Sequence, residues 1–196
     1  MLFTIFPAPQ KAEAAVLSRA PNNLGLVGYW PMNEGRGQQA GDFSGQGNTG
    51  TITGGSTWVD GKRGKALSFN GSTNYVRNAT KGVGAMGTSD FSVSLWVKDG
   101  TIYSDWYETY ISPGNGDGVP KWETNWSVVK MGSLQGSNAG KIAFEIGKGS
   151  GSGYFEFLTP NTVNNGSWHQ IVAVASRASS AYIYVDGVQQ ASTTIS

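Results

Sequence analysis

Hydrophobic and polar residues alternate most clearly in the C-terminal part of the chain. Residues 168–176 and 181–185 form two apolar runs separated by turn-type residues, and the second run leads into Asp186-Gly187. Asp-Gly between apolar runs is a strong hairpin signal, because both central residues of a type I′ turn need a positive φ. The pattern therefore predicts a meander of three strands that continues at residues 188–192.

The two faces of these strands differ in character. Within residues 181–185, Tyr182 and Tyr184 alternate with Ile183 and Val185. Side chains of a strand point alternately to opposite faces, so one face is expected to join a core and the other to form a half-exposed aromatic surface. An isolated hairpin is marginal in water, and the meander therefore needs a larger sheet.

Similar patterns upstream supply the other strands of that sheet. Residues 91–97 alternate best, and we expect Phe91, Val93 and Leu95, together with Trp30, to contribute to the core. Further strands are predicted at residues 26–32, 51–53, 127–131, 141–146 and 154–158. A hairpin of residues 66–69 and 75–77 is predicted around the turn signal Asn70-Gly71.

Composition agrees with an all-β domain. The chain has 29 glycines among 196 residues and 12% aromatic residues, which is typical of many turns and strands. A chain of this length builds one domain with a real core. We assign residues 25–196 to this domain and residues 1–24 to an N-terminal arm, linker or signal remnant.

Five sequence blocks resemble the laminin-G-like, concanavalin A-like jelly-roll domains, in family order. They lie at residues 28–35, 42–48, 58–71, 91–97 and 168–188. The resemblance implies a two-sheet antiparallel jelly-roll sandwich. It does not imply one activity, because this fold hosts lectins, accessory modules of glycosidases, adhesion domains and enzymes.

Charge and cysteine content exclude several classes of function. The formal net charge is +1 and the charged residues are scattered, so nucleic acid is not an expected partner. The chain has no cysteine, which removes disulfides and thiolate metal sites and favours a bacterial or archaeal source for a surface protein. No apolar stretch reaches the length of a membrane span.

A structural calcium ion is one expectation from the resemblance, since family members often hold one in the loop after the first strand. Here that loop offers the carboxylate of Asp42 and the amide oxygen of Asn48, and its glycines let carbonyl oxygens turn inward. Asn70 and Asn74 stand where family members often carry aspartates, which weakens the set of ligands. The alternative is a loop of Asx turns without metal.

The segment 99–124 is the least family-like and carries the candidate ligand residues Trp106, Tyr107, Tyr110 and Trp122. Sugar rings stack on indole and phenol rings while nearby polar groups bond their hydroxyls, so an aromatic-rich loop suits a glycan platform. A long loop also needs to bury aromatic residues to be ordered. The segment is therefore a glycan platform, a satellite core or a protein interface.

Catalytic patterns are missing. The carboxylates Glu145 and Glu156 stand alone on different strands, and the single histidine, His169, begins a strand where the family often has histidine. The sequence predicts a non-catalytic extracellular or cell-surface binding or adhesion module, which is compatible with an accessory module of an enzyme. Glycan is the favoured partner, and a surface protein is the other.

Both ends of the chain leave alternatives open. Residues 2–6 are apolar and an Ala-x-Ala pattern follows, so residues 1–20 are part of an export signal or an arm. Resembling domains continue for at least one strand beyond the Asp-Gly hairpin. Either the natural chain is longer, or a strand comes from residues 1–20 of this or a neighbouring copy. Self-association through residues 1–20 would favour a subunit of a surface layer or filament.

Overall fold

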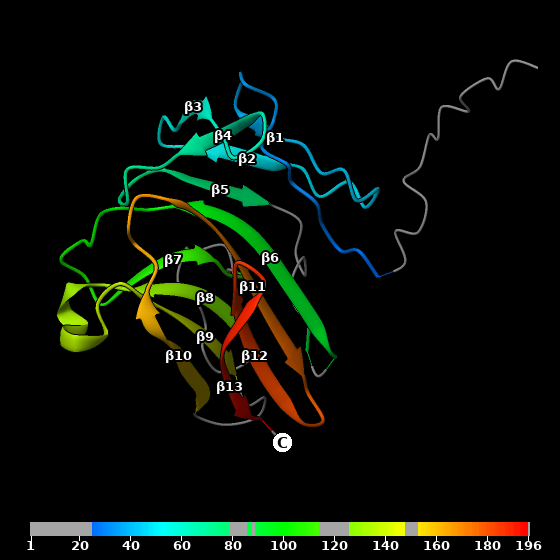
Figure 1. The fold of residues 1–196 in the computed structure, drawn as a ribbon. Coiled ribbons are helices and arrows are strands. Elements are labelled where there is room, and N and C mark those ends of the chain that lie inside the picture. Colours follow the sequence, from blue (N-terminus) through cyan, green and yellow to red (C-terminus); the bar gives the residue numbers. More distant parts are fainter. Residues whose placement is uncertain (1–24, 79–85, 88, 114–125, 148–152, 196) are drawn as a thin grey trace, which may run out of the picture.

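The fold is an antiparallel sandwich of two four-stranded sheets, with two smaller sheets at one end (Figure 1). The structure is a computed structural model that describes residues 25–78, 86–87, 89–113, 126–147 and 153–195. The predicted all-β antiparallel architecture is confirmed. No helix in the described ranges is long and apolar enough to cross a membrane.

The two large sheets are named here by a central strand of each. The β11 sheet has the order β13-β12-β11-β6 and contains β6 (Phe91–Lys98), β11 (Trp168–Ser176), β12 (Ser180–Val185) and β13 (Val188–Thr194). The β9 sheet has the order β10-β9-β8-β7 and contains β7 (Tyr107–Ile111), β8 (Trp126–Met131), β9 (Lys141–Gly147) and β10 (Tyr154–Thr162). A short 3-10 helix, η1 (Ser133–Asn138), connects β8 to β9.

Two small sheets precede them in the chain. One has the order β1-β2-β5 and contains β1 (Gln39–Ala40), β2 (Gly50–Thr53) and β5 (Tyr75–Asn78). The other is a hairpin of β3 (Thr57–Asp60) and β4 (Lys65–Ser68). Figure 1 shows both at the upper end of the sandwich.

The core lies between the facing sides of the two large sheets. Its aromatic centre is Phe91, Trp126, Phe144 and Phe157, with neighbouring ring centroids 5.2 to 6.0 Å apart. The prediction for Phe91, Val93 and Leu95 is confirmed, since Phe91 is buried in this cluster and the half-buried Val93 and Leu95 pack against it. Trp30 is outside it: its indole N–H donates to the carbonyl of Asn48 at 2.7 Å.

The β12–β13 hairpin has the predicted turn. Asp186 and Gly187 have φ angles of 52° and 80°, both positive as a type I′ turn requires. The side chain of Ile183 is fully buried, whereas Tyr182 and Tyr184 lie on the opposite, half-exposed face. The two faces of this strand therefore differ as the alternation predicted.

The strand predicted at residues 26–32 is wrong. These residues form no regular strand, and Tyr29 instead donates its backbone N–H to the Asp42 carboxylate and accepts from the N–H of Phe43. Side chains that bond the backbone offer it an alternative to a sheet ladder. Here Asp42 provides that alternative.

The predicted pairing of residues 66–69 with 75–77 is also wrong. Strand β4 pairs with β3, and β5 pairs with β2. The side-chain oxygen of Asn70 accepts the backbone N–H groups of Ser72, Thr73 and Asn74. The Asn-Gly signal thus builds a self-bonded loop that carries the chain from one small sheet to the other.

Candidate functional site

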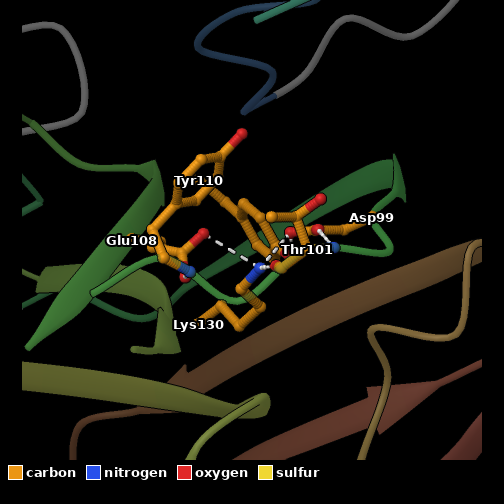
Figure 2. Close-up of polar contacts among 6 residues, drawn as sticks. Asp99, Thr101, Glu108, Tyr110 and Lys130 are labelled. Atoms are coloured by element: carbon orange, nitrogen blue, oxygen red, sulfur yellow. Dashed lines mark hydrogen bonds and ion pairs between the residues drawn. The ribbon is translucent and has the colours of Figure 1, made fainter. Parts of the chain in front are cut away.

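A buried lysine braces the loop that joins β6 to β7. The side chain of Lys130 is fully buried, and its Nζ lies 2.5 Å from Oδ2 of Asp99 and 2.9 Å from Oε2 of Glu108 (Figure 2). It also donates to the carbonyl of Thr101. Alternation along β8 puts Lys130 on the inner face of the β9 sheet, and the register places it opposite Glu108 of β7.

Each charged side chain of the Lys130 network, formed by Lys130, Asp99, Glu108 and Tyr110, has a polar partner. The hydroxyl of Tyr110 donates to Oδ2 of Asp99 at 3.0 Å. Burial raises the pKa of Asp99, but hydrogen bonds from Lys130, the Thr101 N–H and Tyr110 outweigh burial and hold that pKa below its usual value. Burial, followed by the charge of Asp99, raises the pKa of Tyr110. A buried lysine shared by two carboxylates ties three segments of chain together.

The same loop is held by backbone bonds to η1. The N–H of Ser133 donates to the carbonyl of Tyr103 at 3.0 Å, and the N–H of Leu134 donates to that of Asp105 at 3.1 Å. The N–H of Tyr103 donates to Oε1 of Glu108 at 3.0 Å. The backbone of residues 99–106 is therefore fixed from both sides.

The loop and η1 each present apolar side chains to solvent. Tyr103 is 39% exposed, Trp106 56% and Leu134 49%. We call these three residues the aromatic rim. Ser104 and Asp105, both exposed, lie between its two aromatic members in sequence and add a hydroxyl and a carboxylate. The aromatic side chains of the rim can stack on a ligand, and the polar side chains beside them can form hydrogen bonds to it.

The predicted ligand residues are placed on different surfaces. Trp106 belongs to the aromatic rim, whereas Tyr110 points inward to Asp99. Tyr107 lies in β7 opposite Met131, on the outer face of the β9 sheet. Trp122 lies outside the described residues. The prediction that residues 99–124 are loop is wrong at β7, which forms an edge of the β9 sheet.

Lys130 is the site residue that sequence reasoning missed. Its signal was the single charged residue in the mostly apolar run of β8, because a charge buried with its strand needs a partner of opposite charge. The partners Asp99 and Glu108 are 31 and 22 positions away in sequence, so pattern alone did not identify them.

A pair of carboxyl groups corrects another expectation. Glu145 and Glu156 do not stand alone, since they lie directly opposite each other in the β9–β10 ladder. Glu145 is 4% exposed and accepts a hydrogen bond from the hydroxyl of Ser127. Burial, with the nearby charge of Glu156, raises the pKa of Glu145 to about 7. Burial also raises the pKa of Glu156.

The Asp42 loop is bonded to its own backbone. The Asp42 carboxylate accepts four hydrogen bonds: from the N–H groups of Tyr29, Ser44 and Asn48 and from the Ser44 hydroxyl. The side-chain amide of Asn48 donates to the carbonyl of Val27. In this arrangement the Asp42 carboxylate bonds the backbone of its own loop, as the Asx-turn alternative expects, and a calcium site at Asp42 and Asn48 stays a prediction. The described residues contain no cluster of three metal-ligating side chains.

Comparisons of the sequence and of the fold show which known proteins this chain resembles. The sequence profile of the concanavalin A-like lectin/glucanases superfamily matches residues 70–196. No curated protein sequence matches the chain.

Three solved structures share the fold at low sequence identity. The binding domain of Paraclostridial Mosquitocidal Protein 1 has a TM-score of 0.58 and 17% identity; the alignment covers 82% of this chain and 38% of that one. Domain 4 of AbnA, a GH43 extracellular arabinanase from Geobacillus stearothermophilus, solved with arabinotriose, has a TM-score of 0.56 and 23% identity over 78% of this chain and 68% of that one. An S-layer domain-containing protein from Clostridium thermocellum has a TM-score of 0.53 and 15% identity. That alignment covers 85% of this chain and 71% of that one. This chain thus spans well under half the length of the mosquitocidal binding domain.

Proposed function

Because this chain belongs to the concanavalin A-like lectin/glucanases superfamily, we propose that it is a non-catalytic extracellular binding module with glycan as its favoured ligand. The observation that carries the proposal is the aromatic rim, because its two aromatic residues lie on the loop between β6 and β7 that Lys130 holds in place. Ligand sites gain affinity when their side chains are already held in the binding arrangement, because less freedom is lost on binding.

The rim suits the chemistry of a sugar. The indole of Trp106 offers an apolar face for the C–H face of a sugar ring, and the phenol of Tyr103 adds apolar surface and a hydroxyl. Oδ1 of Asp105 accepts the N–H of Trp106 at 2.7 Å, which leaves the other carboxylate oxygen to accept from a sugar hydroxyl. The Lys130 network lies beneath the loop and fixes the positions from which these groups act.

The fold neighbours support the class of function. One is described as a binding domain, and another was solved in complex with arabinotriose. The S-layer domain-containing neighbour supports the second candidate, a subunit of a surface layer or filament. Assembly of that subunit through residues 1–20 is an expectation from the sequence alone. A surface protein as the ligand is the remaining alternative for the rim.

A matched pair of tryptophan variants tests the proposal. Trp96 is a suitable control, because it is 46% exposed but lies on the outer face of the β11 sheet. We expect the wild-type chain to bind members of a glycan array, and Trp106→Ala to weaken binding about tenfold in a titration, as the loss of one stacking contact requires. Trp96→Ala should bind as the wild type does.

Two outcomes would count against this assignment. Equal binding by wild type and Trp106→Ala would remove the rim as the ligand surface. A silent glycan array, together with a mass in light scattering that rises with concentration and falls after deletion of residues 1–20, would favour the surface-layer alternative.

A further inference from the structure

A pocket lies on the side of the sandwich where the two large sheets meet. Its volume is about 320 Å³, and it opens between the edge strands β10 and β13, which lie side by side (Figure 1). The lining residues are Thr159, Asn161, Thr162, Val163, His169, Val185, Asp186, Val188 and Gln190. None of them belongs to the aromatic rim or the Lys130 network.

Both edge strands are irregular at the pocket. The β9–β10 register shifts between Leu158 and Thr162, and the β12–β13 register shifts so that Gln190 has no residue opposite it. The hydroxyl of Thr159 accepts the Ile142 N–H at 3.1 Å and donates to the Asn161 carbonyl at 2.7 Å, which fixes the first bulge. Bulges redirect side chains and are frequent beside binding sites.

A second set of bonds fixes the polar wall. Nδ1 of His169 lies 2.7 Å from Oδ2 of Asp186, and Nε2 lies 3.0 Å from Oδ1 of Asn165. Oδ1 of Asp186 accepts the N–H of Gln170, and Oδ1 of Asn165 accepts the N–H of Ser167. Both ring nitrogens of His169 therefore have hydrogen-bond partners within the chain, and the imidazole forms one side of the pocket in a fixed orientation.

The remaining lining residues define the ligand. Val163 and Val185 are buried and Val188 is exposed, which gives an apolar surface. Asn161 and Thr162 are exposed and Gln190 half-exposed, which gives neutral donors and acceptors. Asp186 is the one carboxylate among the described residues that line the pocket, and its Oδ2 lies 2.7 Å from Nδ1 of His169. The chemistry suits a neutral molecule with an apolar face and several hydroxyls.

We propose that this pocket binds one neutral sugar residue, as a second glycan subsite separate from the aromatic rim. The volume is at the lower end of the roughly 300–1,000 Å³ of ligand pockets, which limits the occupant to about one ring. The inference rests on the proposed function only for its ligand class, because the residues and strands involved are different.

An NMR titration of the full-length chain tests the pocket directly. The probes are arabinotriose and a panel of neutral monosaccharides, and the readout is the side-chain amide signals of Asn161 and Gln190. We expect saturable shifts of both, and Gln190→Ala should weaken the affinity about tenfold, as the loss of a neutral hydrogen bond allows. Gln189→Ala is the matched control, since Gln189 pairs with Tyr184 and does not line the pocket.

The rim variant separates this inference from the proposed function. Unchanged shifts at Asn161 and Gln190 in Trp106→Ala would support an independent subsite. Thr162→Trp, with its fold checked by circular dichroism, should abolish those shifts by filling the pocket. The inference is overturned if the rim responds to the probes while the pocket amides stay still, and equally if Gln189→Ala weakens binding as much as Gln190→Ala.

Discussion

Glu145 is a buried carboxyl group placed directly opposite a second carboxyl group on the same sheet face. Two carboxylates so close together do not both ionise easily, and burial disfavours the charged form further. Its pKa is raised to about 7, from a value of 4.5 without the protein environment. Glu145 is thus a neutral hydrogen-bonding group over most of the acidic range.

This shift predicts a stability that falls as pH rises. Between pH 4.5 and about 7 the folded chain keeps a proton that the unfolded chain has lost, so the free energy of unfolding decreases through that window and is level above it. Glu145→Gln keeps the neutral form at every pH. We expect it to be about 1–3 kcal/mol more stable than the wild type at pH 8 and nearly equal at pH 4.

Urea unfolding at both pH values measures the difference. Glu156→Gln is the control, because it removes the neighbouring charge but leaves Glu145 buried, and its gain at pH 8 should be smaller. Parallel stability curves for wild type and Glu145→Gln across the window would show that Glu145 does not retain its proton in the folded chain.

At the scale of elements, Lys130 joins β8 to β7 and to the loop after β6. Lys130→Met keeps the length of the side chain but leaves Asp99 and Glu108 without a cation. We expect the free energy of unfolding to fall by about 3–5 kcal/mol, as is usual when one partner of a buried ion pair is removed. Tyr110→Phe deletes only one hydrogen bond and should cost about 1 kcal/mol.

A triple variant separates the two causes of lost stability, which are the unpaired carboxylates and the altered packing. Adding Asp99→Asn and Glu108→Gln to Lys130→Met removes the unpaired charges and should recover part of the stability. A loss no larger for Lys130→Met than for Tyr110→Phe, measured by urea unfolding at pH 7, would show that the network contributes no more than an ordinary hydrogen bond.

The elements differ in how far the sequence predicts them. Strands β6, β11 and β12 follow from a clear two-residue period and a type I′ turn, both of which are local signals. Residues 26–32 and the predicted Asn70 hairpin were assigned wrongly because side chains of Asp42 and Asn70 bond the backbone locally. The partners of Lys130, and the meeting of Glu145 with Glu156, depend on register between strands, which a single sequence does not give.

At the scale of the molecule, the buried clusters belong to the two large sheets. Every residue of both clusters lies at position 91 or beyond, apart from the half-buried Met86. The β3–β4 hairpin has no buried residue, whereas β11 and β12 alternate buried and half-buried ones along their length. The β3–β4 hairpin therefore contributes little to the core, whereas the β1-β2-β5 sheet buries Ala40 and Ile52.

This division predicts two levels of protection against hydrogen exchange. Amides of β11 and β12 should exchange only through global unfolding, because Ile171, Ala173 and Ile183 are fully buried. Amides of β3 and β4 should exchange through local opening, with free energies well below the global value. Native-state exchange at rising urea distinguishes the two, since global opening depends steeply on urea and local opening hardly at all. If the β3–β4 amides followed the same steep dependence as β11, the β3–β4 hairpin would have to be part of one cooperative unit with the core.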